Sequence, residues 1–318
     1  MGSHRLSSVT LAVAEMAYQA GFSVVATTAV FHPEFMENAS TAPLPAYPPV
    51  DCRDMLAQIT DFDKALERRF PGRFGERALV GLSLGGFQTL YLAARENLAE
   101  QGLIRFDRYV AIDPPVNLRH GVEVVDSFYE APEEWPADQR QANVNNAVHK
   151  VAGFGSLPAE STGAPPFSGT ESKFLVGMSF RLTLRDTIFS SQTRNNTGVL
   201  QTPISQWRRE PVYQEIMQYS FREYVDNFAL PYCQQNGISR DQLSREINLR
   251  TYQKQLRSDS KIRVIVNEDD FLLTSGDISW LRSTFGSRIT VLPNGGHLGN
   301  LASQPVRSAI ITSLNGMK

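Results

Sequence analysis

The sequence predicts an α/β fold: a mostly parallel central sheet flanked by helices, with a helical cap inserted between two strands. Short apolar runs alternate with amphipathic segments at both ends of the chain, a pattern typical of crossovers onto a parallel sheet. This alternation stops between about residues 116 and 258. Within the 318 residues we therefore expect one discontinuous core, 1–115 and 259–318, and a mostly helical insertion, 116–258.

Helix and strand signals alternate from the beginning of the N-terminal part. Ser7 and Ser8 are suitable N-caps for a helix that stops near Gly21. The β-branched run 22–30 suits a strand buried on both faces, and the proline-rich stretch 31–50 suits a loop.

A second helix is predicted to begin at Asp51, its cap, because apolar residues recur at helical spacing until Pro71-Gly72. The apolar run 78–82 is a predicted strand, a helix follows it to about Asn97, and 106–112 is another predicted strand.

The insertion carries three predicted helical segments: about 173–188, then 216–228 with Pro231 as its end, then 239–256, which is placed to return to the sheet. Several aromatic residues of this region either line an acyl pocket or form the core of the insertion itself, and the sequence leaves both open. These residues are Phe174, Phe180, Phe189, Tyr219, Phe221, Tyr224 and Phe228.

Alternation resumes after the insertion. The runs 261–266 and 288–292 are predicted strands, with a short helix, 277–285, between them and a terminal helix, 303–314, after them.

Composition and charge exclude several classes of function. A net charge of −2 gives no electrostatic reason to expect a nucleic acid or an anionic membrane as partner. The sequence has no run of 18 apolar residues, so we expect no transmembrane segment, and no signal peptide is visible. Cys52 and Cys233 lack metal-ligand spacing, and we expect no metal and no organic cofactor. The compartment stays open: soluble and cytoplasmic by default, or periplasmic or secreted if an N-terminal signal is missing from this chain.

The segment Gly81-Leu82-Ser83-Leu84-Gly85 contains the strongest functional signal. A predicted strand ends in Gly-x-Ser-x-Gly and a predicted helix follows at once. In this context such a motif presents a serine hydroxyl as a nucleophile. The N–H of Leu84 then points towards the reacting carbonyl as one oxyanion donor.

A serine nucleophile requires a base and an orienting acid. In an open parallel sheet these groups gather in the loops at the C-terminal ends of the strands. Such loops carry Ser83, then an acidic run, then His297, which follows two glycines that let its ring reach across the sheet. We favour Asp270 as the acid, because one variable residue and then the apolar Leu272, which can pack beneath the loop, follow it. Asp269 is the alternative, but it would place the acid next to a second carboxylate.

These motifs resemble those of the α/β-hydrolase superfamily, and they look most like its esterase and lipase-like branches. The resemblance spans nearly the whole chain outside the insertion. It implies Ser83 as nucleophile, Asp270 as orienting acid and His297 as base of a catalytic triad. The segments that carry it are Gly81-Leu82-Ser83-Leu84-Gly85-Gly86, Asn267-Glu268-Asp269-Asp270 and Gly295-Gly296-His297-Leu298-Gly299.

The sequence departs from this superfamily at its N-terminus. The superfamily places strands before its first crossover helix, and the second oxyanion donor in the loop that joins them. Here only a short segment with Gly2-Ser3-His4 precedes the first predicted helix. We interpret Gly2 and Ser3 as the end of that oxyanion loop, with the first strands lacking; a tag remnant is the alternative.

The leading hypothesis is a carboxylesterase-like serine hydrolase (EC 3.1.1) that works through an acyl-enzyme on a small-molecule ester, with an acyl chain as one option. The same triad also serves amidases, peptidases and acyltransferases. A catalytically impaired binding protein with the same fold is the alternative from another class, because missing strands would displace or remove the second oxyanion donor.

Overall fold

The computed structural model describes residues 4–96, 102–155 and 166–317. They form an α/β fold around a four-stranded, all-parallel sheet, as the sequence predicts. The strands are adjacent in the order in which they occur along the chain. They are β1 (Ala78–Leu82), β2 (Arg108–Ile112), β3 (Ile262–Asn267) and β4 (Ile289–Leu292).

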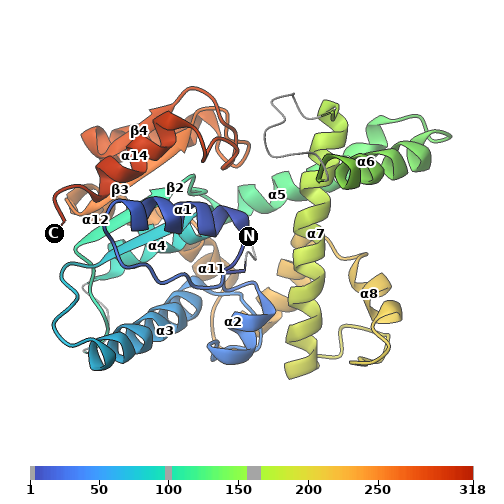
Figure 1. Ribbon diagram of the computed structural model, residues 1–318. Coiled ribbons are helices and arrows are strands. Elements are labelled where there is room, and N and C mark those ends of the chain that lie inside the picture. Colours follow the sequence, from blue (N-terminus) through green and yellow to red (C-terminus); the bar gives the residue numbers. More distant parts are fainter. Residues whose placement is uncertain (1–3, 97–101, 156–165, 318) are drawn as a thin grey trace.

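Helices cover both faces of this sheet (Figure 1). Side chains of β2 alternate between two apolar clusters, Val110 and Ile112 in one and Tyr109 and Ala111 in the other, because successive strand residues point to opposite faces. The first cluster also contains residues of α1 (Ser8–Gln19) and α14 (Gln304–Leu314). The second contains residues of α3 (Pro48–Arg69), α4 (Leu84–Arg95), α12 (Gln253–Ser258) and α13 (Ser275–Phe285).

Helix α3 begins earlier than predicted. Pro48 and Pro49 occupy its first positions, where the missing N–H of proline costs no helical hydrogen bond. Tyr47 is the N-cap, and Asp51 lies buried in the first turn, so Asp51 is not the cap that the sequence suggested. The proline-rich stretch before α3 also contains a short helix, α2 (Pro33–Asn38).

The predicted strand 22–30 is wrong. Residues 22–29 pair with no strand in the part of the chain that the structure describes. Val24 and Val25 are 41% and 51% exposed. β-branched residues favour a strand where a neighbour supplies ladder hydrogen bonds and packing, and here no neighbouring strand does so.

The chain between β2 and β3 is largely helical, as predicted, but most helix bounds differ. The structure adds α5 and α6, lengthens the first predicted helix into α7, and divides the second into short pieces. Pro231 does not end the second predicted helix, because the backbone stays helical from Phe221 to Gln235, with a π-helical turn, Val225–Ala229, shortly before the proline. The helices are α5 (Leu118–Tyr129), α6 (Arg140–Gly155), α7 (Gly169–Arg194), α8 (Glu210–Ile216), α9 (Phe221–Tyr224), α10 (Leu230–Gln235) and α11 (Arg240–Glu246). Short turns of other helix types span Ala131–Glu134, Val225–Ala229, Leu249–Tyr252 and Gly286–Arg288.

Helices of the segment between β2 and β3 form most of a further apolar cluster. Figure 1 shows the long helix α7 beside the sheet core, with α6 and α8 on its outer side. Apolar residues of α7, α8 and α9 pack together, and Leu44 and Leu272 from the rest of the chain join them. The last predicted helical segment does return to the sheet, because Leu249, Tyr252 and Leu256 belong to the cluster on the sheet face. Among the described residues, no helix combines the length and the apolar character needed to cross a bilayer.

Candidate active site

Strand β1 leads into a strained turn at Ser83. The backbone of Ser83 has φ 53° and ψ −121°, a region that favours glycine, and α4 begins at the next residue. Its N–H donates to the Ile112 carbonyl at 2.9 Å, which ties the turn to β2. Gly81 permits this close approach, because a Cβ there would overlap the Gly85 carbonyl and the Thr89 hydroxyl. Strand, turn and helix thus follow one another as the motif predicts.

Three loops at the C-terminal ends of strands bring Ser83, His297 and Asp270 together. Nε2 of His297 lies 2.7 Å from Oγ of Ser83, and Nδ1 lies 2.8 Å from Oδ2 of Asp270. The side chains of His297 and Asp270 are 7% and 0% exposed, and Ser83 is also buried. The three groups form one hydrogen-bonded chain in surroundings that strengthen electrostatic interactions.

The two adjacent aspartates have different partners. Asp270 faces His297 with one oxygen and accepts the N–H of Leu272 with the other, at 2.8 Å. Asp269 accepts the N–H groups of the two glycines that precede His297, at 3.2 and 2.8 Å. Burial opposes the charge of Asp269, but these hydrogen bonds outweigh it and lower its pKa. Asp269 therefore stabilises the loop that carries His297, while Asp270, the acid favoured from the sequence, contacts the ring of His297.

A third carboxylate, Asp113, supports the histidine loop. It follows β2 directly and has a φ of 46°. Its oxygens accept the backbone N–H of Asn267 at 3.0 Å, the side-chain amide of Asn267 at 3.1 Å and the N–H of Leu298 at 3.0 Å. Burial, and next the charge of Asp270, raise the pKa of Asp113 to about 6. Sequence reasoning missed this residue, and its place at the end of a parallel strand was the one signal that could have found it.

The N-terminus of α4 lies beside the serine hydroxyl. Leu84 is the first residue of α4, so its N–H has no intrahelical carbonyl partner. An N–H in this place can donate to an oxygen bound next to Ser83. Gly2 and Ser3, the other predicted oxyanion residues, lie outside the described residues. Within the described ranges, no group of three or more His, Cys, Asp or Glu side chains is arranged to hold a metal ion.

A cavity of about 330 Å³ is lined in part by Ser83. Its buried wall is mainly apolar and comes from both the core and the insertion. Five of the predicted insertion aromatics pack in one apolar cluster, and two of the five, Phe221 and Tyr224, also line the cavity; the other three are Phe180, Phe189 and Phe228. Each of the two alternatives left open by the sequence thus applies to some of these residues. The buried apolar wall includes Val30, Phe87, Tyr224, Ala229, Leu230, Leu243 and Leu272.

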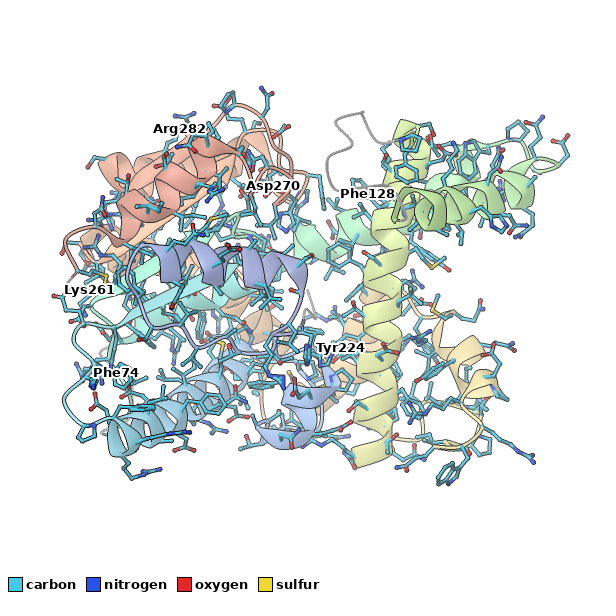
Figure 2. All side chains as sticks on the ribbon, in the orientation of Figure 1. Phe74, Phe128, Tyr224, Lys261, Asp270 and Arg282 are labelled. Atoms are coloured by element: carbon cyan, nitrogen blue, oxygen red, sulfur yellow. The ribbon has the colours of Figure 1, made fainter. Side chains whose placement is uncertain are left out.

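The insertion also contacts the loop that carries Asp270. Phe128 of α5 packs against Phe271 with ring centroids 4.9 Å apart, and the Phe271 ring lies 5.3 Å from the ring of His297. Figure 2 labels Asp270 and Phe128 on the two sides of this junction. The position of α5 and the orientation of the histidine are thus linked through one aromatic side chain.

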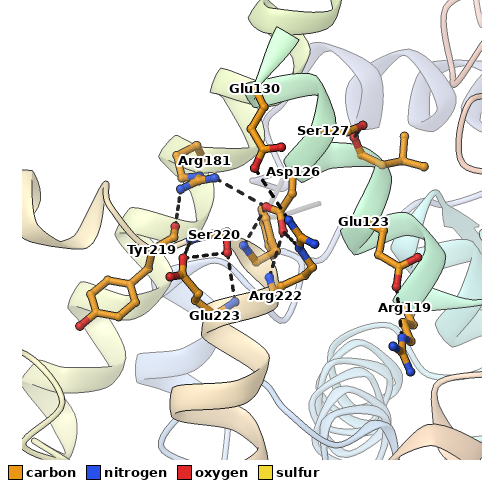
Figure 3. A network of polar contacts seen from close by, with 12 residues as sticks. Arg119, Glu123, Asp126, Ser127, Glu130, Arg181, Tyr219, Ser220, Arg222 and Glu223 are labelled. Atoms are coloured by element: carbon orange, nitrogen blue, oxygen red, sulfur yellow. Dashed lines mark hydrogen bonds and ion pairs between the residues drawn. The ribbon is translucent and has the colours of Figure 1, made fainter. Parts of the chain in front are cut away.

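A polar network fixes the part of the insertion that lines the cavity (Figure 3). Asp126 of α5 accepts the N–H groups of Phe221 and Arg222 at 2.8 and 3.0 Å. Arg181 of α7 lies 3.6 Å from Asp126 and donates to the Tyr219 carbonyl at 2.6 Å. Phe221 and Arg222 both line the cavity. Helices α5 and α7 therefore together position this part of the cavity wall.

No protein-family model and no curated protein matches this sequence. Among solved structures, the chain is similar to a hydrolase from Pseudomonas aeruginosa PA01, at 17% identity and a TM-score of 0.33, over 82% of this chain and 72% of that chain. A likeness this distant carries no argument about activity.

Proposed function

We propose that this protein is a serine hydrolase of carboxylic esters, with Ser83 as nucleophile, His297 as general base and Asp270 as orienting acid. One observation carries the proposal: the hydrogen-bonded chain from Ser83 Oγ through both ring nitrogens of His297 to Asp270, at 2.7 and 2.8 Å. A serine hydroxyl becomes an effective nucleophile when a neighbouring base takes its proton and a carboxylate orients that base.

In the first step, Oγ of Ser83 forms a bond to the acyl carbon while its proton moves to Nε2 of His297. Nδ1–H stays hydrogen-bonded to Asp270, which stabilises the imidazolium. His297 then gives the proton to the alkoxide oxygen as the ester C–O bond breaks, and an acyl-enzyme remains. Water attacks this acyl group and loses its proton to His297, and the proton then returns to Ser83 Oγ as the carboxylic acid leaves.

The negative charge that develops on the carbonyl oxygen requires fixed donors. We assign the N–H of Leu84 as one of them, because it is unused within α4 and adjacent to Ser83. We propose that Gly2 or Ser3 supplies the second oxyanion donor. Loss of one oxyanion donor costs about 3 kcal/mol in the barrier, a factor of roughly 10²–10³ in rate.

The proposal includes membership of the α/β-hydrolase superfamily, with residues 116–258 as a cap. It is supported by the order of Ser83, Asp270 and His297 along the chain, each in a loop after a parallel strand. The triad does not select the leaving group. The mainly apolar cavity of about 330 Å³ favours a small acyl ester over a bulky substrate.

Labelling with a fluorophosphonate probe tests this function. The wild-type protein should be labelled, and Ser83→Ala should abolish labelling. Ser127→Ala is the matched control, because Ser127 is an exposed serine whose Oγ donates to the Val124 carbonyl, and it should leave labelling unchanged. Failure to label a wild-type protein that unfolds cooperatively would overturn the proposal.

The ester class is tested by hydrolysis of p-nitrophenyl esters of graded chain length. Rates should be highest for short acyl chains and fall when the chain exceeds the cavity. A flat profile near background at every length would count against an esterase, even if the probe labels Ser83.

A further inference from the structure

The cavity beside Ser83 contains two buried polar side chains that the proposed reaction does not use. Gln88 of α4 is 5% exposed and Asp51 of α3 is 7% exposed, and both line the cavity together with Ser83. The remaining buried wall is apolar. Buried polar groups are nearly always hydrogen-bonded, so a buried side chain of the wall that has no protein partner indicates what the cavity is built to hold.

Gln88 faces the cavity with its amide unused. It lies four residues after Leu84, one turn along the same face of α4. Across residues 4–96, 102–155 and 166–317, no protein group hydrogen-bonds with the side chain of Gln88. A side-chain amide offers two donors and one acceptor. These groups are available to a molecule that enters the cavity.

Asp51 is the second polar group of the buried wall. Burial, and next the charge of Asp54, raise the pKa of Asp51 well above its usual range, against hydrogen bonds with the backbone of Tyr47 and Ala46. Burial thus disfavours the charged form of Asp51 compared with a carboxyl group in water. A neutral carboxyl group offers one O–H donor and retains acceptor capacity.

The charged side chains of the cavity lie in its exposed part and are largely paired. Arg119 lies 3.2 Å from Glu123, and Arg240 lies 3.0 Å from Asp226. All four are exposed, whereas Gln88 and Asp51 are buried. The buried wall of the cavity therefore combines apolar side chains with two hydrogen-bonding side chains, Gln88 and Asp51.

We propose that this cavity takes an acyl group that carries a neutral hydrogen-bonding group, such as an amide, held by Gln88 and Asp51, in place of a plain alkyl chain. The inference rests on the proposed function, because it places the acyl carbonyl at Ser83. Gln88 comes five residues after Ser83, a rise of about 7.5 Å along α4. An amide a few atoms beyond the carbonyl spans that distance together with the glutamine side chain.

Ligand binding to Ser83→Ala, which cannot form an acyl-enzyme, tests the inference without turnover. Ethyl 3-acetamidopropanoate and ethyl hexanoate have acyl chains of equal length, and only the first carries an amide. Dissociation constants from NMR titration should show tighter binding of the amide ester by about fivefold or more, the worth of one net hydrogen bond. Adding Gln88→Met should remove this preference and leave hexanoate affinity nearly unchanged.

Two further comparisons isolate the polar groups. Asp51→Asn keeps a hydrogen-bonding side chain of similar size and should keep the preference, whereas Asp51→Leu should reduce it. Gln58→Met is the matched control, because Gln58 has a buried, unpaired Oε1 but does not line the cavity. Equal binding of the two esters, tighter binding of the hexanoate, or an unchanged preference in Gln88→Met overturns the inference. Absence of fluorophosphonate labelling in the wild-type protein overturns the proposed function instead, so the two failures are distinguishable.

Discussion

Two clusters in this molecule join separate elements through a buried aspartate, and they differ in what the aspartate faces. Asp126, 1% exposed, accepts two backbone N–H groups and lies 3.6 Å from the guanidinium groups of Arg181 and Arg222. Asp270, 2% exposed, accepts one backbone N–H and faces the ring of His297. Arginine keeps its charge at every physiological pH, whereas histidine exchanges a proton near neutrality.

The difference shows that burial alone does not distinguish a reactive carboxylate. Both aspartates are equally hidden from solvent, and both are hydrogen-bonded to the backbone. Only the partner of Asp270 can take up and release a proton, and only that partner reaches a hydroxyl in a cavity wall. We infer that the Asp126 cluster holds helices of the insertion together, and that the Asp270 cluster serves proton transfer.

The largest expected effect comes from breaking the Asp270 cluster. Asp270→Asn should lower kcat by about 10³–10⁴-fold, because an amide in this place favours the wrong tautomer of His297. Asp269→Asn should cost far less rate, since Asp269 accepts only backbone N–H groups of the loop. Steady-state hydrolysis of a p-nitrophenyl ester measures both. Equal or reversed losses would show that Asp269 is the acid.

Breaking the Asp126 cluster should instead cost stability. Asp126→Ala should lower the free energy of unfolding by about 3–5 kcal/mol, because the Arg181 side chain, 5% exposed, is left without its counter-charge. Glu130→Ala removes a half-exposed carboxylate 3.8 Å from Arg222 and should cost less than about 1 kcal/mol. Urea unfolding measures both variants. If folded Asp126→Ala protein lost probe labelling as completely as Ser83→Ala, the distinction between the two clusters would fail.

One part of the pH dependence of stability sharpens the comparison, because it should arise at Asp113, whose pKa the neighbouring charge of Asp270 helps to raise. The pKa of Asp113 is raised to about 6 in the folded protein, against about 4 in an unfolded chain. The folded state thus holds this proton more tightly, so the stabilising contribution is complete below about pH 4 and is lost as the pH rises to about 6. The loss is on the order of 2–3 kcal/mol.

Asp113→Asn does not titrate at this position and should remove that part of the pH dependence. Urea unfolding of wild type and variant at several pH values between 4 and 7.5 gives the difference directly. Parallel curves for the two proteins would show that Asp113 does not titrate in this range. Asn tolerates the positive φ of residue 113 better than most residues, so backbone strain should not confuse the comparison.

The smallest expected effect concerns the exposed partner of Asp126. Arg222 is 58% exposed, and Arg222→Gln keeps its backbone N–H bonded to Asp126, so it should cost less than about 1 kcal/mol. Arg181→Gln should cost about 3 kcal/mol or more, because Asp126 then loses its buried cation. Denaturant midpoints of the two variants measure this. Equal losses would contradict the idea that burial determines what each arginine contributes.

The sequence predicted the members of the Asp270 cluster but not those of the Asp126 cluster. The members of the Asp270 cluster follow strands whose apolar runs are visible, and the loops after parallel strands meet at one edge of the sheet. The members of the Asp126 cluster lie on separate helices of the insertion, and no local pattern encodes how those helices pack. This cluster could not be predicted without the structure.

The errors in the predicted fold have the same origin. The run 22–30 has strand propensity, but no neighbouring strand pairs with it. Pro231 is a helix breaker by rule, yet the backbone is helical on both sides of it, with a π-helical turn, Val225–Ala229, shortly before it. The place of Gln88 on its helix was predictable, whereas the cavity that it faces requires the insertion. In each case local propensity was correct and the tertiary partner was missing.

The order of the sheet has a consequence for heat inactivation. Ser83 follows β1 and His297 follows β4, the two outer strands, while Asp113 and Asp270 follow the inner ones. Within the described residues, an outer strand has one hydrogen-bonded neighbour, so it should open locally before an inner strand does, and its amides should exchange with deuterium sooner. Fraying of β1 or β4 would separate the Ser83 hydroxyl from the His297 ring, while Asp113 and Asp270 stay in place. Hydrolysis should therefore cease on warming at a temperature below the Tm of the fold.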